Sequence, residues 1–432
     1  MNSVPSKAGI SAPVRVLLTD TNRWALSARL AICLAEMGCH VSAICPARGH
    51  PLLKTRAVQR TFRYGGLRPL DSLRAAIEAV DPQIVIPCDD RGVQHLHELY
   101  TRAWSLGGSG DKLAALIERS LGTPANYPVV SSRYALLAIA QEEGLRVPDT
   151  CLLDAAGKLE SWQSREPFPW VLKADGTWGG GGVRVAHTLE EAQQSLSVLT
   201  RMFRIGRAIK RLCVNRDPFW LRPWWNGSMP SVSVQSYING RPANCAVVCW
   251  EGRVLAGIAV EVISADGETG PASVVRVVDS PEMMLAAERI ACRLGLSGFF
   301  GLDFMIEEGS NVAYLIEMNP RCTPLSHLRI GEGRDMAGAL WSQLAGHPLP
   351  EAPAATQNDL IAYFPQAWNS KSQWLQASFH DIPESEPELV QELLQPWPDR
   401  SVFFRLYCRL HQIGASATAL VARKRPYGEL KT

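Results

Sequence analysis

The sequence predicts an α/β protein of more than one domain, with an open parallel sheet in its N-terminal part. The chain has 432 residues, which is too long for one compact core. Apolar strands alternate with helical segments between residues 14 and 90, and this alternation is typical of parallel β-α-β units. From about residue 170 the strands follow one another as in hairpins. We therefore expect a parallel α/β domain followed by a region of mixed α and β structure.

The first domain is predicted from three strands separated by helices. The strands are VRVLLTD (14–20), HVSAICP (40–46) and QIVIPCDD (83–90), and the helices are RWALSARLAICLAEMG (23–38) and DSLRAAIEAVDP (71–82). We assign residues 1–125 to this domain. Asp89 and Asp90 then stand at the carboxyl end of a strand, where open α/β sheets bind ligands.

The second region begins with a helix over residues 131–144, which Gly144 and Pro148 end. The strands expected after it are WVLKADG (170–176), GVRVAHT (182–188), VSVQSYING (232–240), ANCAVVCWEGRVLAGIAVEVI (243–263), FFGLDFMIE (299–307) and VAYLIEMNP (312–320). Ser280 as a cap and Pro281 at the first position predict a further helix. Residues after 346 are rich in proline and tryptophan and only partly periodic.

The composition narrows the class of protein. The formal net charge is +2 and 46% of residues are hydrophobic, so charge does not indicate a nucleic-acid partner. The eleven cysteines are scattered, which is typical of reduced thiols in the cytoplasm. Cys245 and Cys249 share a strand face and are expected to be buried in the core. The N-terminus lacks the apolar core of a signal peptide, and no stretch is apolar enough to span a membrane. We expect a cytoplasmic protein, and an oligomer is compatible with the sequence.

The stretch KADGTWGGGGV (173–183) contains four consecutive glycines. A phosphate-binding P-loop would need G-K-[ST] after the run, and a dinucleotide fingerprint would need a helix there. A strand follows instead, so we expect the tip of a β-hairpin, whose N–H groups can close over an anion. Lys173, on the strand that enters the tip, would add a positive charge. By itself the run is equally typical of a flexible turn.

Two carboxylates and an amide predict a metal site. Glu317 and Asn319 are two residues apart on one strand, so they share a face. With a short loop of three or five residues around 308–310, Asp303 on the preceding strand would oppose Leu315 and lie diagonal to Glu317 on the same face. These three oxygen-bearing groups suit Mg²⁺ shared with phosphates. The alternative is a solvated strand face.

Together these motifs resemble the ATP-grasp superfamily, and more narrowly the proteins related to the large subunit of carbamoyl-phosphate synthase. The resemblance covers residues 14–330. It implies an N-terminal α/β domain (1–125), a two-lobed ATP-grasp domain (126–345) and a C-terminal extension (346–432). It also implies ATP as cofactor, with Mg²⁺ or, in its place, Mn²⁺.

The resemblance implies a role for particular residues. Lys173 and Arg133 would contact the ATP phosphates, and Arg321 would be the catalytic arginine of the N-P-R motif. Asp303, Glu317 and Asn319 would be the metal ligands. The closing loop would comprise Gly179, Gly180, Gly181 and Gly182, and the hinge beside the base would comprise Gln235, Ser236, Tyr237 and Ile238. The hinge departs from the family pattern, because the family commonly has an acidic residue at Gln235 or Ser236.

The function that the resemblance implies is an ATP-dependent ligase. It would activate a small-molecule carboxylate as an acylphosphate for attack by an amine or similar nucleophile, releasing ADP and phosphate. The alternatives are an ATP-binding regulatory protein without ligase activity and a small-molecule kinase.

Three features remain open at this stage. Residues 201–230 combine basic and aromatic residues, which is compatible with a solvated helix and core tryptophans, with a lid over the substrate, or with contact to a membrane surface. His327 is interpreted either as an acid–base or substrate-binding group or as a structural histidine. The C-terminal tail ARKRPYGELKT is expected to be solvated.

Overall fold

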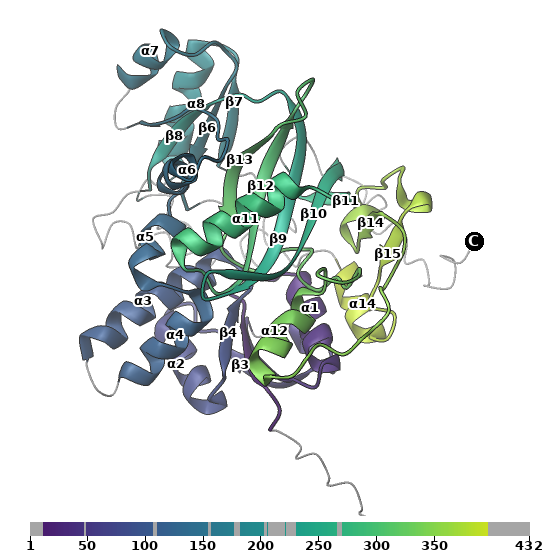
Figure 1. The fold of residues 1–432 in the computed structure, drawn as a ribbon. Coiled ribbons are helices and arrows are strands. Elements are labelled where there is room, and N and C mark those ends of the chain that lie inside the picture. The colour runs from purple at the N-terminus through teal and green to yellow at the C-terminus, as the bar shows by residue number, and fades with distance from the viewer. Residues whose placement is uncertain are drawn as a thin grey trace, which may run out of the picture.

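The strands form three sheets in the part of the chain that the structure describes (Figure 1). The structure is a computed structural model, and it describes residues 12–46, 49–106, 110–153, 157–176, 182–202, 230–265 and 270–395, with Ile205 and Leu221 besides. A four-stranded sheet lies in the N-terminal part, a second four-stranded sheet in the middle, and a seven-stranded sheet runs from the middle to the C-terminal part. None of the described helices is both long and apolar enough to cross a lipid bilayer.

The N-terminal sheet is entirely parallel, as the sequence predicts, with the strand order β3-β2-β1-β4. Its elements are β1 (Arg15–Thr19), α1 (Leu26–Glu36), β2 (His40–Cys45), β3 (Val58–Arg63), α2 (Pro69–Val80), β4 (Ile84–Pro87), α3 (Asp90–Leu106) and α4 (Asp111–Leu121). Strand β3 was not predicted, because it is a largely exposed edge strand that carries few apolar residues. Asp89 and Asp90 follow the carboxyl end of β4, as expected.

The middle sheet is antiparallel, with the strand order β5-β8-β6-β7. Its elements, with the helix that precedes it, are α6 (Arg133–Glu142), β5 (Thr150–Leu153), α7 (Gly157–Gln163), β6 (Trp170–Ala174), β7 (Val183–Ala186), α8 (Leu189–Met202) and β8 (Val232–Ser236). One face is packed through Trp170, Leu172 and Val234 against residues of α7 and α8. Lys173 lies on the opposite face, because side chains alternate along a strand.

The large sheet has the order β13-β12-β9-β10-β11-β14-β15. Its strands and helices are β9 (Gly240–Trp250), β10 (Arg253–Ala265), β11 (Ala272–Val278), α11 (Pro281–Leu294), β12 (Gly298–Glu307), β13 (Ala313–Asn319), α12 (Met336–Ala345), β14 (Leu360–Tyr363), β15 (Phe379–Asp381) and α14 (Pro387–Leu394). Helices α6 and α11 pack on one face, where Cys245 and Cys249 are buried as predicted. Ser280 caps α11 by accepting a hydrogen bond from the N–H of Met283.

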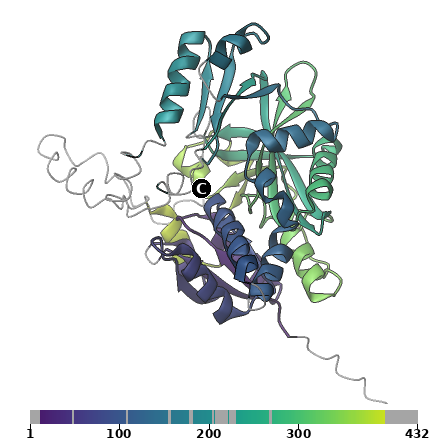
Figure 2. The same cartoon turned by 90° about the vertical axis from the view of Figure 1, so that its left-hand side faces the viewer.

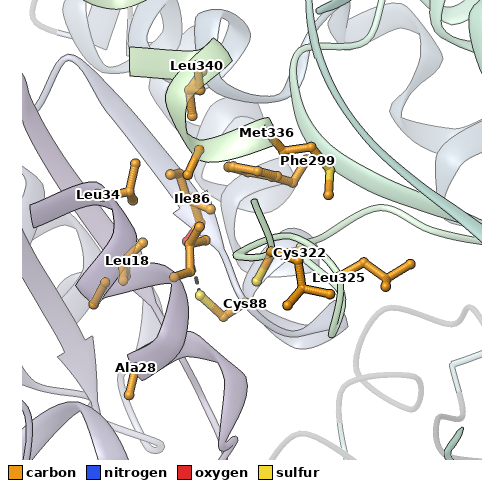
Figure 3. Packing of buried hydrophobic residues seen from close by; sticks show 14 of the residues in the cluster. Leu18, Ala28, Leu34, Ile86, Cys88, Phe299, Cys322, Leu325, Met336 and Leu340 are labelled. Atoms are coloured by element: carbon orange, nitrogen blue, oxygen red, sulfur yellow. Dashed lines mark hydrogen bonds between the residues drawn. The ribbon is translucent and has the colours of Figure 1, made fainter. Parts of the chain in front are cut away.

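A continuous apolar core joins the N-terminal sheet to the other face of the large sheet (Figure 3). Leu18, Leu34 and Ile86 come from the N-terminal sheet and its helix α1. They belong to the same buried cluster as Phe299 of β12 and Met336 of α12. The N-terminal sheet and the large sheet are thus held together by burial of apolar surface rather than by a linker alone.

The C-terminal residues complete this assembly. Strand β14 pairs with β11, and β15 pairs with β14, so residues after 346 extend the large sheet. Figures 1 and 2 show α14 beside the N-terminal part of the chain, and the buried side chain of Arg23 donates hydrogen bonds to the carbonyl and the carboxylate of Glu392. The strands β14 and β15 were not predicted, because each has only three or four residues. The three domain boundaries given by the sequence stay predictions.

Candidate functional site

Lys173 reaches from the middle sheet to the large sheet. Its side chain is 5% exposed, and its Nζ donates a hydrogen bond of 3.2 Å to the carbonyl oxygen of Ile316 on β13. Burial lowers the pKa of Lys173 to about 8, against the attraction of the Glu317 carboxylate, which raises it. The ammonium group is therefore charged in most molecules at pH 7 and lies between the two sheets.

A β-bulge in β13 places the acidic residues. Asp303 pairs directly with Glu317, whereas the next residue, Phe304, pairs with Leu315, so Ile316 is the extra residue. The predicted pairing of Asp303 with Leu315 is therefore wrong. The bulge lets Leu315 remain in the core with α11 while Glu317 emerges on the opposite face with Asp303. The expected convergence of the two carboxylates is thus present, with a different register from the predicted one.

Asp303 and Asn319 are in direct contact. The amide nitrogen of Asn319 donates a hydrogen bond of 2.9 Å to Oδ2 of Asp303. Burial raises the pKa of Asp303 to about 6, and the like charge of Glu317 adds to this rise. Two carboxylates that repel each other at a partly buried position would be stabilised by a cation between them.

Arg133 is paired with the second carboxylate. It is the first residue of α6, and its Nη2 lies 2.7 Å from Oε1 of Glu317. Its Nη1 donates a hydrogen bond of 2.6 Å to the carbonyl of Ala174 and lies 3.6 Å from Oδ1 of Asp175. Arg133 therefore contacts the strand that carries Lys173, and its charge is directed at Glu317.

Arg321 connects the site to the N-terminal sheet. Its Nε donates a hydrogen bond of 3.0 Å to Oδ2 of Asp90, and its Nη2 donates one of 3.1 Å to Oδ1 of Asn319. The Asp90 carboxylate outweighs the effect of burial and raises the pKa of Arg321 above its usual value. The guanidinium also lies 5.8 Å from the ring centroid of Trp24. Arg321 is thus a permanently charged group held in one orientation.

Gly301 explains how the loop after Arg321 comes so close to β12. A Cβ at this position would lie 2.7 Å from Cγ2 of Thr323, which leaves no room for a side chain. The absence of a Cβ allows the loop to pack directly on the strand that carries Asp303.

The four hinge residues link the middle sheet to the large sheet. Gln235 and Ser236 end β8, and Gly240 begins β9. Gln235 is 1% exposed, and its Nε2 has no hydrogen-bond partner among the described residues. Tyr237 is 41% exposed and Ile238 is half-buried.

The remaining predicted residues are placed as follows. Strands β6 and β7 form the predicted hairpin, and Gly182 precedes β7. Gly179, Gly180 and Gly181 lie outside the described residues, as do most of the segment 201–230 and the C-terminal tail. His327 is buried and its Nε2 lies 2.8 Å from Oδ2 of Asp381, which supports the structural interpretation of this histidine.

Two contributors to the site were not assigned from the sequence. Asp175 accepts a hydrogen bond of 2.6 Å from the hydroxyl of Ser231 and one from the N–H of Arg133. It directly follows Lys173 and Ala174, which was the available signal. Asp90 was placed correctly at a strand end, but its pairing with Arg321 joins residues 231 positions apart and no local pattern shows it. Asp89 accepts hydrogen bonds from the N–H groups of Thr21 and Gly92 and so has a structural role.

Comparison with known proteins identifies the fold. Residues 222–324 match the sequence model of the ATP-grasp domain. This part of the chain is therefore similar to an ATP-grasp domain. The phosphoribosylamine–glycine ligase of Ralstonia nicotianae is 26% identical over 206 residues, which cover 47% of this chain and 44% of that protein. The alignment thus spans less than half the length of that curated relative.

Solved structures share the fold of this chain. An N5-carboxyaminoimidazole ribonucleotide synthetase, solved with ADP, superposes with a TM-score of 0.56 at 14% identity, covering 79% of each chain. A biotin carboxylase from Campylobacter jejuni, solved as a complex with an ATP compound, gives a TM-score of 0.56 at 16% identity, covering 78% of this chain and 72% of the other. Neither is a carbamoyl-phosphate synthase, so the narrower resemblance stays a prediction.

The residues of the site fit a metal–nucleotide group. The like charges of Asp303 and Glu317 repel each other, and a divalent cation would relieve this repulsion. The buried amide nitrogen of Gln235 has no hydrogen-bond partner among the described residues. The protein supplies few metal ligands here, because the described ranges contain no group of three or more His, Cys, Asp or Glu residues that could hold a metal ion. Phosphate oxygens would have to complete the coordination.

Replacing Lys173 by methionine is expected to stabilise the nucleotide-free protein at pH 7 by about 3 kcal/mol, since one unit of pKa shift corresponds to about 1.4 kcal/mol. The folded pKa is about 8 and the ordinary value is 10.5. The unfolded wild-type chain thus keeps its proton between these values while the folded protein loses it, so wild-type stability rises with pH across this window. The advantage of the variant should shrink over the same window.

Urea denaturation at pH 7 and at pH 10 measures this difference, and nucleotide titration should show weaker binding by the variant. The exposed Lys112 offers a matched control, since Lys112→Met removes a solvated charge and should leave the stability unchanged. A Lys173→Met variant that is less stable than wild type at pH 7 would contradict the inference that burial of the Lys173 ammonium destabilises the folded protein.

Proposed function

We propose that this protein is an ATP-dependent ligase that activates a carboxylate substrate as an acylphosphate. An amine or similar nucleophile then attacks the acylphosphate, and ADP and phosphate are released. The observation that carries the proposal is the meeting of Lys173 with the bulge of β13, which brings the carboxylate pair of Asp303 and Glu317 and the charge of Arg321 to one place. Such a grouping suits transfer of a phosphoryl group between two anions.

The chain supplies phosphate-binding groups from both sides of the site. Lys173 comes from the middle sheet and Arg133 from the start of α6. In the proposed complex Arg133 moves its charge from Glu317 to a phosphate, and Glu317 then becomes available as a ligand. The glycine loop would close over the phosphates, and the hinge would border the base.

ATP with Mg²⁺, or Mn²⁺ in its place, would supply the transferable phosphoryl group and neutralise its charge. Asp303, Glu317 and Asn319 would hold the metal. Because the Oδ1 of Asn319 also accepts a hydrogen bond from Arg321, the amide links the metal ligands to the proposed catalytic arginine. Arg321 would stabilise charge that develops on the phosphoryl group or on the tetrahedral oxyanion.

The names of the relatives support the ligase reading. The curated relative is a ligase that joins phosphoribosylamine and glycine, and one of the structural neighbours is an L-amino acid ligase from Bacillus licheniformis. For this chain the substrates are proposed only as a small-molecule carboxylate and a small-molecule amine.

ADP release across a library of amino acids and other carboxylates tests the proposal, followed by isotope transfer with the active pair. With ¹⁸O-labelled carboxylate, label is expected in inorganic phosphate, because the carboxylate oxygen attacks the terminal phosphorus and stays with it. Label in AMP would overturn the mechanism. Label kept in a stable phosphorylated product would favour the kinase. ATP binding without ADP release for any pair would favour the regulatory protein.

A further inference from the structure

We propose that the side-chain amide of Gln235 contacts the 6-position of the purine base and lets the site accept a 6-oxo purine as well as adenine. The inference rests on the nucleotide binding proposed above and adds to it a residue that determines base specificity. The starting point is Gln235. Among the described hinge residues, it alone has a buried side chain that can form hydrogen bonds and that lies on the same face of the middle sheet as Lys173.

The register of the middle sheet places Gln235 on the nucleotide side. Gln235 pairs with Val171, and Lys173 pairs with Ser233. All four side chains therefore lie on one face of the sheet, opposite the face that packs on α7 and α8. Gln235 is diagonal to Lys173, at about 7–8 Å between backbone positions. A base placed there would leave its phosphates within reach of Lys173.

The amide nitrogen of Gln235 is buried without a partner. Gln235 is 1% exposed and its Nε2 makes no hydrogen bond among the described residues. The hydroxyl of Thr150, which is paired with Gln235 on β5, donates to the carbonyl of Pro148 and makes no hydrogen bond with this amide nitrogen. A buried donor left unpaired destabilises the folded protein. A ligand that accepts this hydrogen bond removes the penalty.

Packing alone does not account for a glutamine here. On the opposite face of the same strand, Val232 and Val234 fill the core with apolar side chains. An apolar residue at position 235 would satisfy burial equally well and would leave no donor unpaired. A glutamine is explained if a bound group uses its amide.

An amide and a carboxylate read the 6-position differently. The amide offers both a donor and an acceptor, so by rotation it can accept from a 6-amino group or donate to a 6-oxo group. An ionised carboxylate is an acceptor only. It can bind the amino group, whereas it repels the oxo group. Exchange of Gln235 for glutamate should therefore change the ratio of the affinities for the two nucleotides. The added negative charge also repels the phosphates, but it does so equally in both nucleotides and cancels in the ratio.

The experiment measures binding of Mg²⁺·ADP and Mg²⁺·IDP by titration calorimetry, because IDP carries a 6-oxo group in place of the 6-amino group. The variants are Gln235→Glu and Gln235→Met, and the control is Gln163→Glu. Gln163 is exposed at the end of α7 in the same lobe, so its exchange adds the same charge away from the proposed base site.

In Gln235→Glu the affinity ratio of ADP to IDP is expected to rise about tenfold or more over wild type, since a factor of ten corresponds to one lost charged hydrogen bond. The control should keep the wild-type ratio. Gln235→Met should weaken both nucleotides and raise the melting temperature of the nucleotide-free protein, because the unpaired donor is gone. A merely structural glutamine would not move the ratio.

Two results would overturn the inference and are distinguishable from each other. Measurable ADP binding with an unchanged ratio in Gln235→Glu would remove the base-reading role and leave the proposed function standing. No binding of either nucleotide to the wild-type protein would remove both.

Discussion

Replacing Glu317 by glutamine is expected to lower the magnesium-dependent turnover by about a thousandfold, because a bound metal supplies several kcal/mol of charge stabilisation. Glutamine keeps an oxygen that can accept the hydrogen bond that Arg133 now donates to the carboxylate at 2.7 Å, so the variant should fold. Alanine would be a poorer choice, since it would leave the buried Arg133 without this acceptor.

Turnover as a function of magnesium concentration, together with a melting curve, tests this expectation. Glu288→Gln is the matched control, because Glu288 is exposed on α11 and should behave as wild type. Near-normal turnover of Glu317→Gln with an ordinary magnesium dependence would remove Glu317 from the metal site.

Replacing Asp381 by asparagine is expected to destabilise the protein by about 3–5 kcal/mol, since breaking a buried ion pair leaves an uncompensated charge. Asp381 is 4% exposed and contacts both Arg29 of α1 and His327 of the loop after Arg321. Arg29 and His327 together outweigh the effect of burial and lower the pKa of Asp381 from 3.8 to about 2.

The pH dependence of stability provides the second measurement. The unfolded carboxylate takes up a proton near its ordinary pKa while the folded one does not. The contribution of Asp381 is therefore present above about pH 4 and is lost as the pH falls towards 2. The stability of the variant should therefore fall less steeply than that of wild type between about pH 4 and pH 2. Asp279, which is 89% exposed beside Arg334, offers a control whose exchange for asparagine should have little effect. A Asp381→Asn variant as stable as wild type at pH 7 would contradict the role of the cluster.

Local sequence patterns were sufficient for three of the four strands of the N-terminal sheet and for the convergence of Asp303 and Glu317 on one face. Strand alternation, the cap at Ser280 and the two-residue spacing of Glu317 and Asn319 all depend on neighbours in the sequence. The register of Asp303 was mispredicted because a bulge adds one residue without changing composition. The core position of Leu315 was the signal that could have revealed it, since this apolar side chain cannot share a face with two carboxylates.

Contacts between distant segments were not predictable from the sequence. The ion pair of Arg321 with Asp90 and the hydrogen bond between His327 and Asp381 depend on how the sheets pack together. The strands β14 and β15 are too short to be recognised; β14 pairs with the edge of β11, and β15 pairs in turn with β14. The hinge departure at Gln235 was visible in the sequence, but its burial without a partner required the structure.

The packing of the C-terminal helix α14 on the core of the N-terminal sheet has a consequence for synthesis on the ribosome. Helix α1 belongs to a core that includes Leu389 and Val390 of α14. The first strands leave the ribosome long before these residues are translated. At about 5–20 residues per second, the interval between the end of β2 and α14 is roughly 20–70 s. During this time the nascent chain exposes apolar surface of its first domain. We therefore expect it to bind a chaperone until its last elements emerge.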